Sequence, residues 1–147
     1  MKKDTTILIS LACLFKESKG KLYWLLVKPN EDSEWEFPRA TVRKGESSVR
    51  AILRVMGELA GMSARVLEEV GRGSATINLN GRPVPQKFLY YLLEYKASAG
   101  EIFGFHDFVW LEYGKALRAI TSKKEAAQLR EARQVLAKWK RDHSKSL

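Results

Sequence analysis

The chain has 147 residues, of which 45% are hydrophobic and 29% are charged, and these proportions are ordinary for a globular domain. No apolar run reaches the roughly 18 residues that a membrane-spanning helix requires, so we expect no membrane partner. The single cysteine, Cys13, excludes an internal disulfide framework and favours a cytoplasmic protein. At this length we expect one domain that covers residues 1–147.

The first half of the chain predicts strands followed by a helix. Residues 7–15 and 22–28 are apolar runs of strand length. Residues 35–38 are expected to be extended, because the residue before a proline avoids the helical region. Ser47 is a suitable N-cap for a helix with apolar residues at helical spacing, and Gly61 is placed to end that helix.

The second half predicts a hairpin and two further helices. Residues 65–78 and 85–96 form extended patterns on either side of Asn80-Gly81, a dipeptide that favours a type I′ turn. The remaining predicted elements are a strand at 108–111, a short helix at 114–120, a long amphipathic helix at about 123–141 and a flexible tail at 142–147. This mixed order favours an α+β chain, or a three-layer α/β/α sandwich around a mixed sheet.

Positive charge is concentrated near the end of the sequence. The formal net charge is +9, and residues 113–147 hold ten Lys or Arg against three Asp or Glu, which is +7 of that total. Such asymmetry favours a polyanionic partner, which can be a nucleotide, a nucleic acid or another acidic surface. The alternative is a solvated cationic helix that only keeps the protein soluble.

The stretch WEFPRATVRKGESSVRAILRVMGELAGM, residues 35–62, resembles the box of the Nudix family, G-x5-E-x7-R-E-U-x-E-E-x-G-U, where U is a bulky aliphatic residue. Glu46, Arg54 and Glu58 match three charged positions of the box. Val55 and Leu59 stand where the family has glutamates. The remaining correspondences are Ala40 at the first glycine and Met56, Gly61 and Met62 at the bulky, glycine and final bulky positions.

Segments outside the box extend the resemblance over nearly the whole chain. Phe37-Pro38-Arg39, residues 67–72 and residues 107–111 are similar to segments of the dinucleoside polyphosphate hydrolase branch. The resemblance therefore implies a Nudix-type three-layer α/β/α sandwich with a mixed sheet. It also implies a nucleotide or polyphosphate ligand.

The altered box changes what the resemblance implies about metal. In Nudix enzymes the box carboxylates hold Mg²⁺ or Mn²⁺, which activates water for attack on a diphosphate link. Val55 and Leu59 cannot ligate a metal, so we expect no metal cofactor. If an ordinary hydrolase site survives, the resemblance assigns Glu58 and Glu46 as catalytic or metal-binding residues, and Asp107 is the nearest further carboxylate.

The segment before the predicted helix is richer in cations than the family pattern. Arg39, Arg43 and Lys44 lie in it, and Arg54 follows on the helix. Lys87 and Tyr90 lie on a strand whose neighbours in the family face a nucleotide base, although alternation lets only one of Tyr90 and Tyr91 face a cleft. We expect the six residues Arg39, Arg43, Lys44, Arg54, Lys87 and Tyr90 to contact a phosphate-rich ligand.

Three hypotheses follow from these observations. The favoured one is a Nudix-fold protein that binds a nucleotide or other phosphate-rich ligand without ordinary metal-dependent hydrolysis. The first alternative is an atypical Mg²⁺- or Mn²⁺-dependent hydrolase of dinucleoside polyphosphate-like substrates, which would use Glu46 and Glu58. The second alternative is a module that binds RNA, another nucleic acid or a protein, with nucleic acid contacting the basic C-terminal helix.

Overall fold

The centre of the molecule is a mixed β-sheet. The computed structural model describes residues 6–98 and 104–144, apart from the side chains of residues 59 and 60. The strands are β1 (Ile7–Ser18), β2 (Lys21–Lys28), β3 (Arg39–Thr41), β4 (Met62–Leu79), β5 (Arg82–Ser98) and β6 (Asp107–Leu111). They form a six-stranded sheet in the order β4-β5-β1-β2-β6, with β3 paired to β1. β1 and β5 run parallel, whereas the other paired strands are antiparallel.

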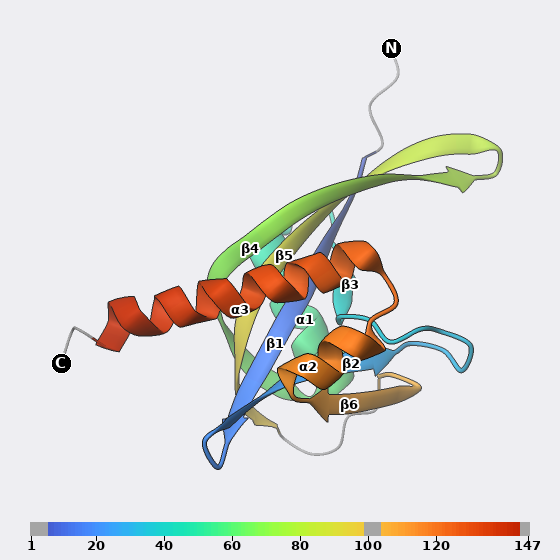
Figure 1. Cartoon of the computed structure of the whole chain (residues 1–147). Coiled ribbons are helices and arrows are strands. Elements are labelled where there is room, and N and C mark those ends of the chain that lie inside the picture. Colours follow the sequence, from blue (N-terminus) through green and yellow to red (C-terminus); the bar gives the residue numbers. More distant parts are fainter. Residues whose placement is uncertain (1–5, 99–103, 145–147) are drawn as a thin grey trace.

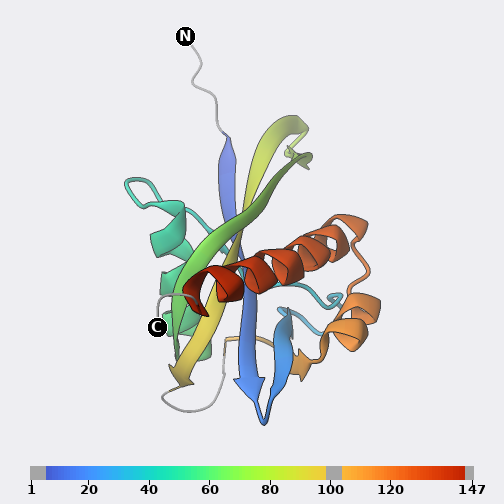
Figure 2. The same cartoon turned by 60° about the vertical axis from the view of Figure 1, so that its left-hand side comes forward.

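Helices cover both faces of this sheet. α1 (Ser48–Ala60) lies on one face, and α2 (Tyr113–Ala119) and α3 (Lys123–Ser144) lie on the other. α3 crosses the sheet diagonally, as Figures 1 and 2 show from two directions. The prediction of a three-layer α/β/α sandwich with a mixed sheet is thus confirmed.

Strand alternation gives each face its own core. Leu11, Cys13 and Phe15 of β1 are buried together with residues of α2 and α3. Ala12 and Leu14, the residues between them, are buried together with residues of α1. The period-2 pattern of β1 therefore supplies side chains to both layers, which explains why this strand reads as a continuous apolar run in the sequence.

Local sequence signals place the ends of α1 and the turn of the β4–β5 hairpin as predicted. The Ser47 hydroxyl accepts a hydrogen bond from the Arg50 amide at 3.1 Å, so Ser47 is the N-cap of α1. Gly61 ends the helix with φ of 58°. Asn80 and Gly81, with φ of 53° and 79°, form the turn between β4 and β5.

The end of the β4–β5 hairpin extends beyond the rest of the sheet. β1 begins to pair with β5 at Ile7 and Gln86, whereas β4 and β5 remain paired as far as Leu79 and Arg82. We call residues 74–86 the hairpin arm. The arm curves away from the body of the molecule (Figure 1). Its side chains are exposed or half-buried throughout.

Some boundaries differ from the predictions. Among the described residues, the segment 35–38 makes a single β-bridge, between Glu36 and Val27. The adjoining strand is β3, in which residues 39–41 pair with β1. That pairing partner lies about thirty residues earlier in the chain, so local sequence does not reveal it. α3 continues to Ser144, three residues past its expected end, and residues 145–147 of the predicted tail lie outside the described part of the chain.

None of the helices in the described ranges has the combination of length and apolar character needed to cross a membrane.

Candidate functional site

Glu46, the first glutamate of the box pattern, is held by hydrogen bonds at the start of α1. Arg54, from the second turn of the helix, donates to its two carboxylate oxygens over 2.8 and 3.1 Å. The Arg43 amide donates to the same carboxylate at 3.0 Å, and Arg54 also donates to the Thr41 carbonyl at 3.1 Å. These contacts, led by the Arg54 hydrogen bonds, lower the pKa of Glu46 to about 2. The ionised Glu46 carboxylate thus connects the loop of residues 41–46 to α1.

The other box positions do not converge on a set of metal ligands. Glu58 has a side chain that is 56% exposed, and its carboxylate lies 3.8 Å from the Arg54 guanidinium. Val55 is buried in the core beneath α1, and the Leu59 side chain lies outside the described residues. Asp107 accepts a hydrogen bond from the Phe108 amide at 2.8 Å.

Mg²⁺ and Mn²⁺ need several oxygen ligands around one point. Within the part of the chain that the structure describes, no group of three or more His, Cys, Asp or Glu side chains is placed to hold a metal. Glu46 is already bound by Arg54, and Val55 offers only methyl groups. At the position of Val55 the family pattern has a glutamate, so one of the expected oxygen ligands is missing from this chain.

Arg39, expected to contact phosphate, is committed to an ion-pair network. Its guanidinium lies 3.0 Å from Glu36 and 2.9 Å from Glu125. Glu125 comes from α3, is 8% exposed and also accepts a hydrogen bond from the Phe37 amide at 3.0 Å. Glu125 is not among the residues predicted from the sequence to have a role. The only signal for it is the Ser122-x-x-Glu125 spacing typical of a helix start, which does not predict its long-range partners.

Tyr90 lies in the core rather than at a binding surface. Its side chain is 4% exposed on the α2–α3 side of the sheet, where its ring meets Phe37 edge-on at 6.4 Å between centroids. Burial raises the pKa of Tyr90 to about 12, and the nearby Glu125 adds to the shift. Tyr91 points to the opposite face, where its hydroxyl lies 2.5 Å from the Ser48 hydroxyl. Alternation along β5 thus removes Tyr90 from the candidate ligand-binding residues.

Two adjoining hollows lie beyond the N-terminus of α1. The loop hollow, about 440 Å³, is lined by residues 6–8 and 41–46. The arm hollow, about 550 Å³, is lined by Leu8 and by residues 72–74 and 87–89. Leu8 contributes to both, and its side chain is 37% exposed. We refer to the two hollows together as the basic groove.

The walls of the basic groove bring predicted phosphate-binding cations together. Arg43 and Lys44 come from the loop before α1, and Lys87 comes from β5. Among the described residues, none of these three side chains forms an ion pair, while Arg72 is paired with Glu69 at 3.1 Å. Leu8 and Leu89 add apolar surface. A groove of this kind can hold an anion beside an apolar group.

Only part of this groove was predictable from the sequence. Arg43, Lys44 and Lys87 are among the expected phosphate-binding residues, whereas Leu8, Arg72 and Leu89 are not. Leu8 stands beside Lys87 through the parallel β1–β5 pairing, and Arg72 stands beside Leu89 through the β4–β5 hairpin. Arg54, which was also expected to contact phosphate, donates to the Glu46 carboxylate instead of lining either hollow.

Comparisons with known proteins agree with the architecture. No model of a protein family matches the sequence, and no curated protein matches it either. Solved structures do match, with a C. elegans Ap4A hydrolase binary complex at TM-score 0.69 and 18% identity, over 89% of this chain and 98% of that one.

Two further structures give the same result. The NUDIX domain of Shewanella oneidensis NrtR, complexed with ADP ribose, has TM-score 0.67 and 20% identity, over 92% of this chain and 90% of that one. A MutT protein from Methanosarcina mazei has TM-score 0.64 and 17% identity, over 91% and 97%. The chain therefore has the Nudix fold, as its altered box and flanking segments predicted.

Proposed function

We propose that this Nudix-fold protein binds a nucleotide or another phosphate-rich ligand in the basic groove, without ordinary metal-dependent hydrolysis. Arg43, Lys44 and Lys87 would contact the phosphates, and Leu8 and Leu89 would pack against the less polar part of the ligand. The expected cytoplasmic location belongs to the same proposal, since nucleotides are abundant there and the single cysteine is buried.

The observation that carries this proposal is the separation of acids from cations around α1. Glu46 is bound by Arg54, and Val55, which stands at a glutamate position of the family pattern, has no atom that can ligate a metal. Arg43, Lys44 and Lys87 remain without an ion pair in residues 6–98 and 104–144. Cations that face an open groove can neutralise phosphate directly, with no bridging metal. Such a site stabilises the bound ligand as well as any transition state, so it favours binding over catalysis.

The similar solved structures support the class of ligand. One is an Ap4A hydrolase and another was solved with ADP ribose. Both of these compounds join nucleosides or sugars through phosphate. Together with the flanking segments that resemble the dinucleoside polyphosphate hydrolase branch, they favour a ligand with a diphosphate or longer phosphate chain.

Calorimetric titration tests the proposal directly. ADP, ADP-ribose, Ap4A and inorganic diphosphate would each be titrated in EDTA and again in Mg²⁺. We expect binding of at least one of them in EDTA, with an affinity that Mg²⁺ does not increase. Lys87→Gln and Arg43→Gln should each weaken binding about tenfold, the value expected for loss of one charge-assisted hydrogen bond.

A matched control removes the same charge outside the groove. Arg82→Gln changes an exposed residue at the tip of the hairpin arm that does not line either hollow. The Arg82→Gln variant should bind each compound with the same affinity as the parent protein. If none of the four compounds binds in EDTA, or if Arg82→Gln weakens binding as much as Lys87→Gln, the basic groove is not the site.

The same samples test the hydrolase alternative. Its supporting observation is Glu58, whose exposed carboxylate remains on the helix face beside Arg54. An active enzyme would need Mg²⁺ or Mn²⁺ and would release product from Ap4A or ADP-ribose. Turnover that requires metal and disappears in Glu58→Gln would establish this alternative and reject the non-hydrolytic proposal.

A further inference from the structure

The outward face of α3 carries a line of cations. The residues that face the sheet are apolar apart from Glu125, and they include Leu129, Ala132 and Leu136. At 100° per residue, the opposite side of the helix presents Lys123, Arg130 and Arg141 almost in line, with Lys138 beside them. We call these four residues the α3 crest. Only small or uncharged residues lie between them on this side, namely Ala127, Gln134 and Ala137.

The cations of the α3 crest are available for an external partner. All four are exposed, and none forms an ion pair with another described residue. Two neighbouring cations are already engaged: Lys140 pairs with Glu17 at 2.6 Å, and Arg133 lies 4.2 Å from the centre of the Tyr113 ring. The exposed acids of α3, Glu131 and Asp142, are not in line with Lys123, Arg130 and Arg141 but lie on the flank next to Lys138. Lys138 also lines a hollow together with Asp142, Glu68 and Glu69, so it is the crest cation with the most acidic surroundings.

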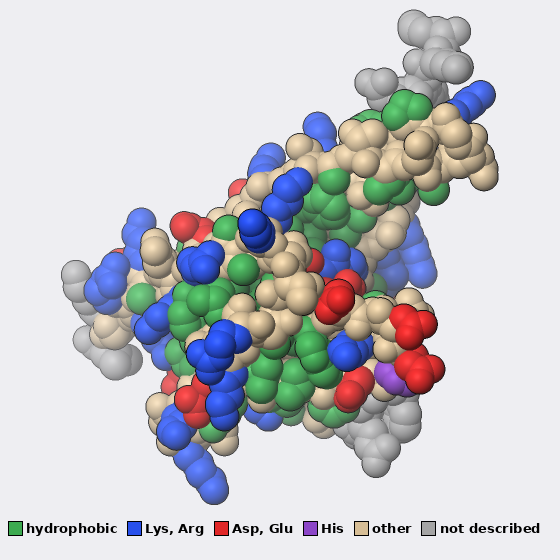
Figure 3. Space-filling view, turned by 45° about the vertical axis from the view of Figure 1, so that its right-hand side comes forward, with side chains coloured by type: hydrophobic (Ala, Val, Ile, Leu, Met, Phe, Trp, Pro, Cys, Tyr) green, Lys and Arg blue, Asp and Glu red, His purple; other side chains and the backbone are tan. Residues whose placement is uncertain are grey.

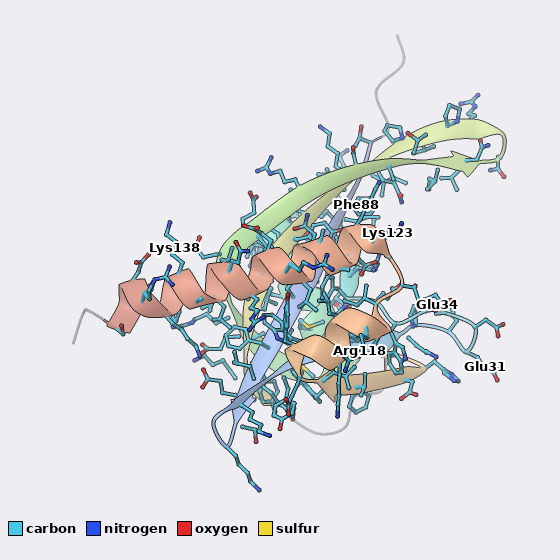
Figure 4. The ribbon with its side chains drawn as sticks, viewed as in Figure 1. Glu31, Glu34, Phe88, Arg118, Lys123 and Lys138 are labelled. Atoms are coloured by element: carbon cyan, nitrogen blue, oxygen red, sulfur yellow. The ribbon has the colours of Figure 1, made fainter. Side chains whose placement is uncertain are left out.

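The basic surface continues from α3 onto α2. Lys115 and Arg118 of α2 are exposed, and neither forms an ion pair within the described part of the chain. Figure 3 shows Lys and Arg side chains spread over this side of the molecule, and Figure 4 labels Arg118 on α2 and Lys123 and Lys138 on α3. The acidic loop that carries Glu31 and Glu34 projects at the side, away from α3 (Figure 4). The cations of α2 and α3 therefore give this face of the molecule a positive potential that attracts a polyanion.

The surface offers contacts to phosphates but not to bases. The only tryptophan of α3, Trp139, is half-buried and stacks on His143 at 3.9 Å, with Arg65 at 5.5 Å from its ring. The α3 crest contains no aromatic ring on which an unpaired base could stack. Such a surface suits a nucleic acid whose bases are already paired.

The length and rigidity of α3 match a regular duplex. Lys123 and Arg141 are 18 residues apart, which is about 27 Å along a helix axis. A duplex carries one phosphate per strand for about every 3.4 Å of its axis, so the crest covers about eight base pairs. α3 packs on the sheet from Glu125 to Leu136, and its last turns extend past the sheet (Figure 1), so a duplex can approach its outward side without rearrangement of the helix.

We propose that α3, with the adjoining part of α2, binds double-stranded nucleic acid through its phosphate backbone and without reading base sequence. Lys123, Arg130, Lys138 and Arg141 would each contact a phosphate. Double-stranded RNA and double-stranded DNA present this same chemistry, and the test below distinguishes them. This surface lies on the opposite side of the sheet from α1, so the inference does not depend on the proposed nucleotide site.

Fluorescence anisotropy with labelled oligonucleotides tests the inference on the full chain. A duplex RNA, a duplex DNA and the corresponding single strands would be titrated at several salt concentrations. Four phosphate contacts predict a slope of about −3.6 for log K against log salt on B-DNA. Arg130→Gln and Arg141→Gln should each make the slope shallower by about 1, to the same extent for unrelated sequences.

Arg50→Gln is the matched control. Arg50 is an exposed residue of α1, on the opposite face of the sheet, and its removal changes the net charge by the same amount. It should leave the slope unchanged. Circular dichroism of each variant would establish that the exposed substitutions leave the fold intact.

The outcomes separate clearly. The inference is supported if a duplex binds more tightly than the single strands and the slope is shallower in both α3 variants. Whether the RNA or the DNA duplex binds more tightly then shows which of the two is preferred. Equal binding of single strands overturns it. So do an unchanged slope in Arg130→Gln and a failure of every duplex to bind at low salt.

Discussion

Glu46 and Arg54 match two charged positions of the box pattern, and the two side chains form an ion pair with each other. The carboxylate receives three hydrogen bonds, two from Arg54 and one from the Arg43 amide. The guanidinium in turn reaches the Thr41 carbonyl. The pair therefore fastens the loop of residues 41–46 to α1, and it shapes one wall of the basic groove.

The lowered pKa of Glu46 predicts a specific sensitivity to acid. Folding lowers this pKa from 4.5 to about 2, so the ionised carboxylate stabilises the native state above pH 4.5 and this contribution is lost as the pH falls toward 2. Glu46→Gln should therefore reduce the dependence of the unfolding free energy on pH in this range. Denaturant unfolding at a series of pH values measures the effect. Identical pH profiles for parent and Glu46→Gln would contradict it.

The sequence predicts contacts between residues that are close in the chain, but not contacts between residues that are far apart in the chain. Ser47 and Asn80-Gly81 act on backbone groups within three residues, so their roles follow from the sequence. Arg39 was expected to contact phosphate because it is a cation next to the box. Its actual partner, Glu125, lies 86 residues away, and only the packing of α3 brings the two together.

At the scale of elements, Glu125 joins the α3 layer to the strand segment that precedes the box. Its carboxylate receives the Phe37 amide at 3.0 Å and the Arg39 guanidinium at 2.9 Å. Burial and the neighbouring Glu125 raise the pKa of the Cys13 thiol well above its usual range, which is consistent with an apolar surrounding. The linkage holds residues 37–39 against the sheet just before β3.

Removing this carboxylate should destabilise the fold. Glu125→Ala leaves the Phe37 amide without its buried acceptor and removes one of the two carboxylates that pair with Arg39. We expect a loss of about 2–3 kcal/mol in the free energy of unfolding, because hydrogen bonds to charged groups are worth about that much. Urea unfolding measures it. Glu131→Ala, an exposed change on the same helix, should alter stability by no more than about 0.5 kcal/mol.

The helices and strands themselves were largely predictable, because their patterns are long and periodic. α3 shows a clear apolar stripe, and β1 is a nine-residue apolar run in the sequence before it continues to Ser18. β3 was not predicted, since three residues carry no periodicity and pair with a distant strand. The basic groove was only partly predictable for the same reason: its walls come from β1, β4, β5 and a loop that meet through the sheet.

At the scale of the whole molecule, the hairpin arm is the part with the least support from the core. Its residues 76–85 pair only within the hairpin among the described residues, whereas β5 beyond Gln86 is flanked by both β4 and β1. None of the arm side chains is buried. The arm can therefore open without unfolding the sandwich.

Hydrogen exchange should resolve this difference in local stability. Backbone amides of residues 76–84 that take part in the hairpin should exchange faster than those of residues 88–93, because the central strand opens only with larger unfolding. Mass spectrometry of peptides from the two segments measures both rates. Equal protection in the two segments would mean that another part of the chain or a second molecule covers the arm.

The parallel pairing of β1 with β5 has a consequence for the order of folding. Ile7 pairs with Gln86, and Phe15 pairs with Glu94, so the central contact of the sheet joins residues 79 positions apart in sequence. During synthesis, β1 cannot acquire this neighbour until residues 86–94 have left the ribosome. Until then the apolar run of β1 can pair only with β2 and β3, which precede α1 and the β4–β5 hairpin in the chain. A slow final step that inserts β1 into the sheet is the expected kinetic signature of this topology.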